Sequence, residues 1–400
     1  MLKRALLTGG ILLSLGSASL ASPDYLTFAQ GAIPLSVTID GVAMDPYFAG
    51  NVQPIDGSPT AFVLIRSGTA ASKAELIYAL PAATTFSRFA VPSIGEVPSL
   101  HTTFVKQIEV HGSAKGPDAG YELLASATLA THKTKDEVTE LPIAKQTAVR
   151  WVKITLSGGI DVQTPKVSLQ FSELIGHGTQ EPAPLSTGFT GSWAGKGVLI
   201  ELRQAGATVS GCYDKEGKLD GTVSGTVLRA VGVDIRDKVK SLFVLTVGAD
   251  GRLRGLRSTN GAPFKIYTAP GAPAGTKTQC RDSSPPKLGC GSVIHAINFD
   301  FDSAAIREDS KAVLDDLYVG LKSDPAKAIV IEGHTSSEGA PAHNVDLSKR
   351  RAQAVVDELI KRGLPRSRLA PAGKGPSEPI ASNADETGRA MNRRVEVECR

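Results

Sequence analysis

The sequence predicts a multidomain, mostly β protein that ends in an α/β domain. Apolar and polar residues alternate with a period of two over much of residues 22–268, as is typical of strands with one buried face. Proline-containing segments at 177–187 and 269–289 divide the chain, and strand and helix patterns alternate only after the second of them. The 400 residues suffice for two to four domains, and 41 glycines with few aromatic residues favour turn-rich β domains over helical bundles.

The first 21 residues have the layout of a secretory signal peptide. Lys3 and Arg4 precede a mostly apolar stretch at 6–15, and Ser19-Leu20-Ala21 offers small residues at a cleavage site. A membrane anchor is the alternative, but the apolar stretch is shorter than the ~20 residues that span a bilayer. We therefore expect cleavage before Ser22 and export of the mature chain to oxidising surroundings, where disulfides persist.

Residues 22–176 are predicted to form a β-sandwich of the jelly-roll type. Val152, Ile154 and Leu156 fall on one face of an expected strand, and Lys153 falls on the other. The domain resembles the discoidin-like, galactose-binding-like jelly rolls in three segments, at 107–113, 150–156 and 171–176. The resemblance implies a carbohydrate or an envelope protein as a partner at one end of the sandwich. A purely structural sandwich is an equally open interpretation.

Residues 188–268 are predicted to form a small antiparallel barrel or meander. Short strand patterns are joined by the turn segments Asp214–Gly217 and Asp250–Gly251, which are typical of hairpins. The sequence assigns no activity to this domain, and the segments 177–187 and 269–289 are expected to be linkers.

Residues 290–400 carry the most specific pattern in the chain. Apolar residues at 313, 314, 317 and 321 have helical spacing, and a second helical stripe consists of Ala352, Val355, Val356 and Leu359. Strand patterns at 293–299, 328–332, 369–373 and 394–398 surround these helices, which predicts a compact α/β sandwich.

The same region resembles the OmpA-like family over about a quarter of the chain. The resemblance rests on motifs that occur in the family's order and at its spacings, namely Asn298-Phe-Asp-Phe-Asp-Ser303, Glu332-Gly-His-Thr335, Asn344-Val-Asp-Leu-Ser-Lys-Arg-Arg-Ala352, Arg368-Leu369, Gly373-Lys-Gly375 and Gly388-Arg-Ala-Met-Asn-Arg-Arg-Val-Glu396. It implies a domain that binds peptidoglycan without covalent bonds, through the diaminopimelate of the peptide stems.

The residues also allow a direct interpretation of such a site. Asn344, Leu347 and Arg351 stand at i, i+3 and i+7 and share one helix face, while Thr335 and Asp302 follow expected strands. Strand ends and a helix N-terminus thus meet at one edge, which is the usual ligand edge of α/β sheets. The planar Arg351 suits a carboxylate, and Asp302 could accept a hydrogen bond from an ammonium.

The resemblance assigns ligand contacts to six residues, and at one neighbouring position the sequence differs from the family pattern. The six are Phe301, Asp302, Thr335, Asn344, Leu347 and Arg351. The family usually has an aspartate after the Gly-His-Thr run, and it holds the ligand ammonium; here that position is Ser336, followed by Ser337 and Glu338. Asp302 or Glu338 could compensate, the preferred peptide could differ, or the domain could have lost wall binding.

The four cysteines allow more than one disulfide pattern. Cys290 precedes the first strand of the last domain and Cys399 follows its last, so antiparallel pairing of these strands would bring the two together. Cys212 would then pair with Cys280, and the rival is a small loop closed by Cys280 and Cys290.

Composition and motifs exclude several other functions. With 44 basic and 40 acidic residues, the charge is too balanced to predict a nucleic-acid partner. The seven histidines are scattered, and no spacing predicts a metal site, a cofactor or a catalytic triad. The resemblance to the OmpA-like family thus favours a non-enzymatic, wall-anchored protein of a Gram-negative envelope. Such a protein would present its β domains to a ligand or partner in the periplasm or at the outer membrane. A carbohydrate-binding or adhesin-type protein that uses the last domain only for retention is the alternative, and an enzyme has the least support.

Overall fold

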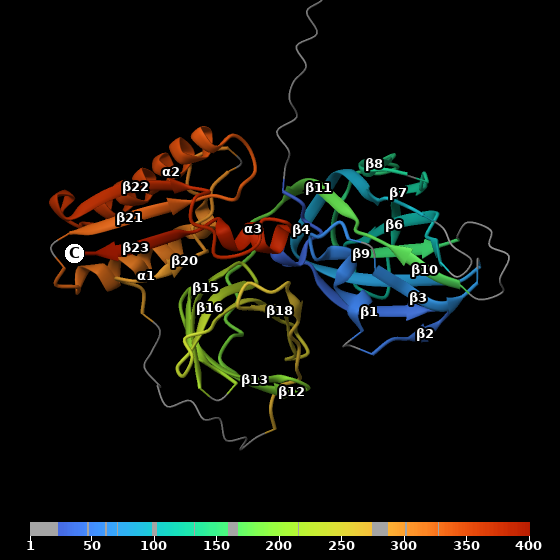
Figure 1. The fold of residues 1–400 in the computed structure, drawn as a ribbon, viewed down its shortest axis with the longest axis horizontal. Helices are drawn as coiled ribbons and strands as arrows, with labels where there is room; N and C mark the ends of the chain where they lie inside the picture. The colour runs from blue at the N-terminus through green and yellow to red at the C-terminus, as the bar shows by residue number, and fades with distance from the viewer. Residues whose placement is uncertain are drawn as a thin grey trace, which may run out of the picture.

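The computed structural model describes residues 23–400, apart from 46–47, 61, 70, 98–101, 132, 159–166, 215, 274–286, 301 and 327. The predicted signal peptide therefore lies outside the described residues. Figure 1 shows two β regions and a C-terminal α/β region grouped around the short helix α3. Strand residues outnumber helical residues among the described residues, in agreement with the predicted fold class.

The N-terminal region is a β-sandwich built around one long strand. Its strands are β1 (Ile33–Ile39), β2 (Val42–Ala43), β3 (Phe62–Gly68), β4 (Lys73–Ile94), β5 (Thr102–Phe104), β6 (Gln107–Ser113), β7 (Glu122–Thr128), β8 (Lys135–Leu141), β9 (Ala148–Ser157), β10 (Val167–Phe171) and β11 (Ile175–Gln180). One sheet has the order β2-β1-β4-β9-β6-β7, with β8 and β11 also paired to β4, and the facing sheet has the order β3-β10-β5. Val152, Ile154 and Leu156 of β9 are fully buried, as their alternation predicts.

The last strand of the sandwich extends beyond the predicted domain edge. β11 pairs antiparallel with β4 as far as Gln180, so the linker predicted at 177–187 begins inside a strand. The sequence pattern does not indicate a strand at His177–Gln180, because this segment is polar. It forms a strand through backbone pairing with β4 and not through an apolar pattern.

The middle region is an antiparallel meander that closes on itself. It consists of β12 (Gly191–Gly195), β13 (Val198–Ala205), β14 (Thr208–Tyr213), β15 (Gly217–Ser224), β16 (Val227–Asp234), β17 (Lys240–Val247), β18 (Leu253–Thr259) and β19 (Lys265–Ile266), paired in that order. The following residues Ala269 and Gly271 bridge to Leu253 of β18 and Trp193 of β12, so the two ends of the meander meet. Figure 1 shows the resulting ring of strands.

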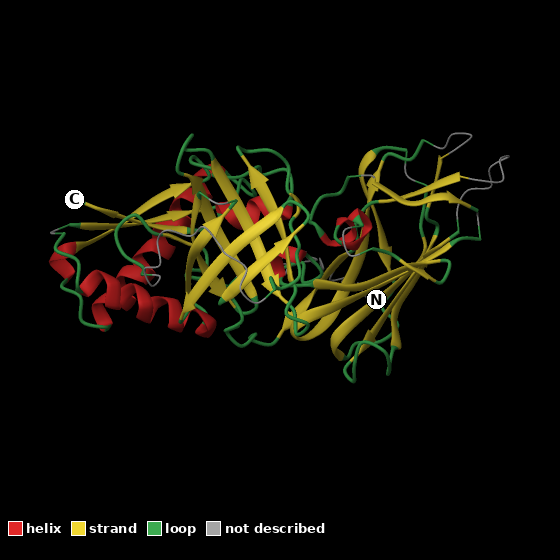
Figure 2. Cartoon of the chain, turned by 90° about the horizontal axis from the view of Figure 1, so that it is seen from below, coloured by secondary structure: helices red, strands yellow, loops and turns green. Residues whose placement is uncertain are grey.

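The C-terminal region is a four-stranded sheet covered by helices on one side. Its elements are β20 (Val293–Ile294), α1 (Lys311–Lys322), β21 (Ile329–His334), α2 (Pro341–Lys361), β22 (Leu369–Gly375), α3 (Glu386–Asn392) and β23 (Val395–Cys399), and the sheet order is β20-β23-β21-β22. The apolar stripes predicted for α1 and α2 are buried against this sheet, and Figure 2 shows both helices on the same face. β20 is shorter than the strand predicted at 293–299, because only Val293 and Ile294 find partners on β23. Short 3-10 helices lie at Phe28–Gln30, Ala49–Asn51, Gln53–Ile55, Glu308–Ser310 and Arg366–Arg368.

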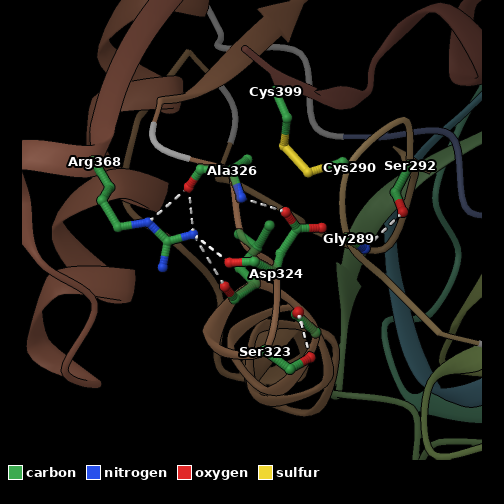
Figure 3. Close-up of a disulfide and its surroundings, with 10 residues drawn as sticks. Gly289, Cys290, Ser292, Ser323, Asp324, Ala326, Arg368 and Cys399 are labelled. Carbon is green, nitrogen blue, oxygen red and sulfur yellow. Dashed lines mark hydrogen bonds between the residues drawn. A yellow bond between two sulfur atoms is a disulfide. The ribbon is translucent and has the colours of Figure 1, made fainter.

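A disulfide joins the two ends of this C-terminal region. Cys290 and Cys399 are bonded with their Cα atoms 5.5 Å apart, as the antiparallel pairing of β20 and β23 implies. Figure 3 shows the turn beside it, where Arg368 donates hydrogen bonds to the carbonyl oxygens of Asp324 and Ala326, each 2.8 Å long. The rival pairing of Cys280 with Cys290 is therefore wrong. Cys212 is also disulfide-bonded, and Cys280 lies outside the described residues.

The three regions pack directly against one another. The barrel residues Val227, Leu242, Val244 and Leu256 belong to the same buried apolar cluster as the sandwich core. The barrel also touches the C-terminal region, where the side-chain amide of Asn298 donates a 2.6 Å hydrogen bond to Ser224 Oγ. None of the described helices is long and apolar enough to cross a membrane.

Helix α3 provides the contact between the C-terminal region and the sandwich. The backbone N–H of Glu386 donates to the carbonyl oxygen of Gly57 at 2.8 Å, and Thr387 Oγ1 donates to the carbonyl oxygen of Asp56 at 2.9 Å. The first turn of α3 thus satisfies its free N–H groups partly on the sandwich.

Candidate functional site

The predicted site residues lie at one edge of the C-terminal sheet, where β21 ends and α2 begins. Two glycines allow α2 to approach this edge, because a Cβ on Gly333 would lie 2.3 Å from the Ser348 carbonyl oxygen and one on Gly373 would lie 2.6 Å from that of Val345. The backbone N–H of Thr335 bonds to the Gly375 carbonyl oxygen at 3.0 Å and fixes the loop that leaves β21.

Arg351 is held by the loop that follows β20. Its Nε donates to the Ser303 carbonyl oxygen at 2.8 Å and its Nη2 to that of Asp300 at 3.3 Å, and its guanidinium lies 5.0 Å from the Phe299 ring centre. Burial lowers the pKa of Arg351 to about 10, and the positive charge of Arg393 adds to this effect, so the side chain stays charged at neutral pH. Nη1 has no hydrogen-bond partner among the described residues, so a donor remains available beside the loop.

Asp302 lies at the rim of the same edge and already has a partner. Its backbone φ is 48°, an uncommon left-handed conformation for aspartate, and its carboxylate lies 2.6 Å from Nε2 of His343 in the first turn of α2. The neighbouring residue Phe301, also predicted to contact the ligand, lies outside the described residues.

The loop between β21 and α2 is held by the buried Asn344. Its Nδ2 donates to the carbonyl oxygen of Glu338 at 2.7 Å and to that of Ser336 at 3.5 Å. Leu347 is buried one turn later, and Thr335 is buried with no hydrogen-bond partner for its hydroxyl among the described residues. The buried Asn344 and Leu347 therefore support the backbone of the site. Thr335 Oγ1 is a polar group of the site that has no partner among the described residues.

Ser336 faces a carboxylate from its own loop. Its hydroxyl donates to Glu338 Oε2 at 3.3 Å, so the Glu338 carboxylate lies beside the position where the family pattern has aspartate. Arg389 Nε and Arg393 Nη1 lie 3.5 and 3.7 Å from the two oxygens of this carboxylate. Both arginines also pair with Glu386, which lies in the first turn of α3.

The site thus contains more charged groups than the sequence prediction named. Arg389 and Arg393 lie within the family motif at 388–396, but no sequence pattern indicates a role for them or for His343. Ser337 is also tied to the segment before α3, because its backbone N–H donates to Asn383 Oδ1 at 3.1 Å. Three arginines and three carboxylates, Asp302, Glu338 and Glu386, therefore gather at one edge, where they could bind a ligand that carries both charges.

Comparison with known proteins identifies the region that carries this site. Residues 298–393 match the model of the OmpA family. Outer membrane porin F of Pseudomonas aeruginosa is 44% identical over 103 residues, which are 26% of this chain and 29% of porin F. Outer membrane protein A of Bordetella avium is 39% identical over 100 residues, which are 25% of this chain and 52% of that protein.

Two solved structures are similar to different parts of the chain. The peptidoglycan-associated lipoprotein from Burkholderia pseudomallei is 32% identical, covers 26% of this chain and 88% of its own, and has a TM-score of 0.25. CBM32-3 from a family 31 glycoside hydrolase of Clostridium perfringens is 10% identical, covers 40% of this chain and 95% of its own, and has a TM-score of 0.28.

The sequence matches extend over only part of each relative. The matched segment is less than a third of porin F and about half of the Bordetella protein, so neither relative describes the whole of this chain. The motifs, the strand order and the family match agree for one region, and residues 298–393 form an OmpA-family domain.

Proposed function

We propose that this chain is a non-enzymatic envelope protein whose C-terminal domain binds peptidoglycan without covalent bonds, through the diaminopimelate of the peptide stems. The proposal rests on the family of the domain, for which the motifs imply this ligand, and on the charges at the site edge. It places the protein in the periplasm or at the outer membrane. The sandwich and barrel would be presented there to a further ligand or partner.

The observation that carries the proposal is the presence of both charge types at one edge. The free end of diaminopimelate carries an ammonium and a carboxylate on one carbon, so its recognition needs a donor group and an acceptor group side by side. Arg351 has an unpartnered Nη1 among the described residues and is fixed by two backbone carbonyls, which suits it to the carboxylate. Asp302 and Glu338 are exposed carboxylates that could accept hydrogen bonds from the ammonium.

The start of α2 adds to the attraction for the carboxylate. Pro341 occupies the first turn, and no described side chain caps this end of the 21-residue helix. Backbone N–H groups there remain free, and the helix dipole favours negative charge near them.

Co-sedimentation of the full chain with purified peptidoglycan tests the proposal. Arg351→Ala should weaken binding by about 2–5 kcal/mol, a loss of at least roughly thirtyfold, because it removes one partner of a charge pair in a partly desolvated site. Arg350→Ala is the matched control, since Arg350 pairs with Asp346 on the exposed side of the same helix at 2.7 Å. Unchanged sedimentation of a folded Arg351→Ala protein would rule out this site.

Arg351→Lys separates charge from geometry at the same position. Lysine keeps the positive charge but lacks the planar fork that matches a carboxylate. Binding should fall between that of the wild type and that of Arg351→Ala. Circular dichroism of each variant shows whether the hydrogen bonds to the 300–303 loop are needed for folding.

A further inference from the structure

A second polar cluster lies on the sheet of the C-terminal domain, on the face that α1 and α2 do not cover. Glu332 and His334 alternate with the core residues Ile331 and Ile329 along β21, so their side chains point to the opposite face. Glu378, from the segment after β22, reaches the same place. The ligand atoms of these three side chains all lie within 4.8 Å of one another.

The histidine of this cluster is buried without a partner. Its side chain is 1% exposed, and neither ring nitrogen has a hydrogen-bond partner among the described residues. The nearest carboxylate oxygen of Glu396 lies 3.9 Å from Nε2, which is too far for a hydrogen bond. Buried polar groups in proteins nearly always have partners, so an unsatisfied imidazole directed at two carboxylates needs an explanation.

We propose that Glu332, His334 and Glu378 form a binding site for a divalent transition-metal ion. An imidazole nitrogen with two carboxylates suits Zn²⁺ or a similar ion, whereas Ca²⁺ and Mg²⁺ prefer oxygen ligands alone. Zinc ligands at 2.0–2.2 Å in tetrahedral geometry are about 3.4 Å apart, so the three atoms need to close by roughly 1 Å. A water molecule would complete the coordination.

The charges around the cluster also favour a dication. The carboxylates of Glu332, Glu378 and Glu396 are accompanied by two cations, Lys374 and Arg394, which leaves one negative charge in excess. Lys374 Nζ lies 2.9 Å from Glu378 and 3.5 Å from Glu332, so its ammonium stands where the metal would bind. Because Lys374 is a long, partly exposed side chain, it can swing outward, and replacement of its charge by a dication makes the cluster neutral.

A bound metal would join β21 to the segment that leads into α3. Arg394 Nη2 already donates to the Glu378 carbonyl oxygen at 2.9 Å. In the same segment, Asn383 Oδ1 accepts a hydrogen bond from the backbone N–H of Ser337, in the loop between β21 and α2. The metal would therefore act as a structural ion that makes one side of the candidate peptidoglycan site more rigid. In the only other described group of this kind, Cys290, Asp324 and Cys399, both cysteines are already in the disulfide.

Isothermal titration of the full chain with Zn²⁺ tests the proposal. The wild type should bind one ion, and Glu378→Gln should weaken the affinity at least about tenfold, because a neutral amide is a poor ligand. Lys374→Met should instead tighten binding by a similar factor, since it removes the competing ammonium. Glu358→Gln is the matched control, because Glu358 lies on α2, which covers the other face of the sheet, and pairs there with Arg362 at 2.6 Å, so the affinity should stay nearly unchanged.

Anomalous scattering at the zinc edge from crystals of the zinc-loaded protein locates the ion independently of these variants. The expected peak lies within coordination distance of His334, Glu332 and Glu378. No saturable binding by the wild type would overturn the proposal. So would an anomalous peak elsewhere, or affinities that do not change in Glu378→Gln and Lys374→Met.

Discussion

The candidate site of the C-terminal domain and the N-terminal sandwich differ in how far their carboxyl groups are exposed to solvent. In the C-terminal site, the side chains of Asp302 and Glu338 are 40% and 62% exposed, and they lie beside His343 and Arg389, respectively. In the sandwich, Asp24 and Asp56 are partly buried and Glu173 is 3% exposed, with one oxygen unpartnered among the described residues. The two exposed carboxylates are available to a peptide ligand, whereas Asp24, Asp56 and Glu173 affect the stability of the fold.

The pKa values of these three carboxyl groups of the sandwich are raised by burial. Burial raises the pKa of Asp24 to about 7, although its Oδ1 accepts backbone hydrogen bonds from Leu26 and Gly176. Burial also raises the pKa of Asp56 to about 7 and that of Glu173 well above its usual value. Since α3 docks on the carbonyl oxygens of Asp56 and Gly57, these groups lie next to the contact between the two domains.

The two domains also differ in that the C-terminal domain is closed by a disulfide. Removal of this disulfide should produce the largest change in the free energy of unfolding. Residues 22–180 contain no cysteine, whereas Cys290 and Cys399 close a segment of 109 residues. The double variant Cys290→Ser/Cys399→Ser should lose up to about 4.7 kcal/mol of unfolding free energy in the chain-entropy model. Hydrogen-exchange mass spectrometry should show faster exchange in β20 and β23, with the sandwich strands β6 and β9 unchanged. An equal loss of protection in both domains would show that they unfold as one unit.

Acidification should stabilise the sandwich. The folded-state pKa values of Asp24 and Asp56 are about 7, above the ordinary value near 4 of an unfolded chain, so the folded state holds more protons between these limits. Stability should therefore fall as the pH rises from about 4 to about 7 and level off above it. Each group contributes up to about 1.4 kcal/mol per pH unit.

Thermal unfolding of the full chain between pH 5 and pH 8 measures this effect. Asp24→Asn and Asp56→Asn should each flatten the pH dependence, because asparagine keeps an acceptor oxygen but does not titrate. Asp118→Asn, at an exposed position of the same domain, should leave the slope unchanged. A melting temperature of the wild type that rises with pH over this range would contradict the prediction.

The parts of the fold that the sequence predicted are those that depend on local periodicity. The apolar stripes of α1 and α2 and the alternation in β9 are buried as expected, because each pattern reflects one face of one element. β11 was missed because its polar residues gain strand structure only from the pairing with β4. A barrel was one of the two predicted forms of the middle region, but Ala269 and Gly271, which close it, fall in the expected linker 269–289 because their bridges join residues far apart in the chain.

The part of the candidate site that lies on one helix follows from sequence spacing. Asn344, Leu347 and Arg351 share a face of α2, and Arg351 Nη1 has no hydrogen-bond partner among the described residues. The pairing of Asp302 with His343 and of Glu338 with Arg389 and Arg393 joins segments far apart in the chain. No local pattern contains these tertiary contacts.

The smallest expected effect concerns Ser336, where the chain departs from the family pattern. A neutral hydroxyl holds an ammonium less strongly than a carboxylate does, so Ser336→Asp should tighten binding of a diaminopimelate-containing wall tripeptide. The gain should be about 1 kcal/mol, or roughly five- to tenfold. The new carboxylate would lie beside Glu338, and Arg389 and Arg393 would offset the repulsion between the two.

Two substitutions in the wild-type background identify the carboxylate that now binds the ammonium. Glu338→Gln should weaken binding if Glu338 substitutes for the missing aspartate, and Asp302→Asn should weaken it if that role belongs to Asp302. Titration of the three variants with the tripeptide at low and high salt decides between them, because an exposed pair weakens as salt rises. We expect the role to belong to Glu338, since its carboxylate accepts the hydrogen bond from Ser336. Both carboxylates already have partners, because Glu338 pairs with Arg389 and Arg393 and Asp302 pairs with His343. If Ser336→Asp binds no tighter and neither Glu338→Gln nor Asp302→Asn binds more weakly, the ammonium is not recognised at this edge and diaminopimelate is not the ligand.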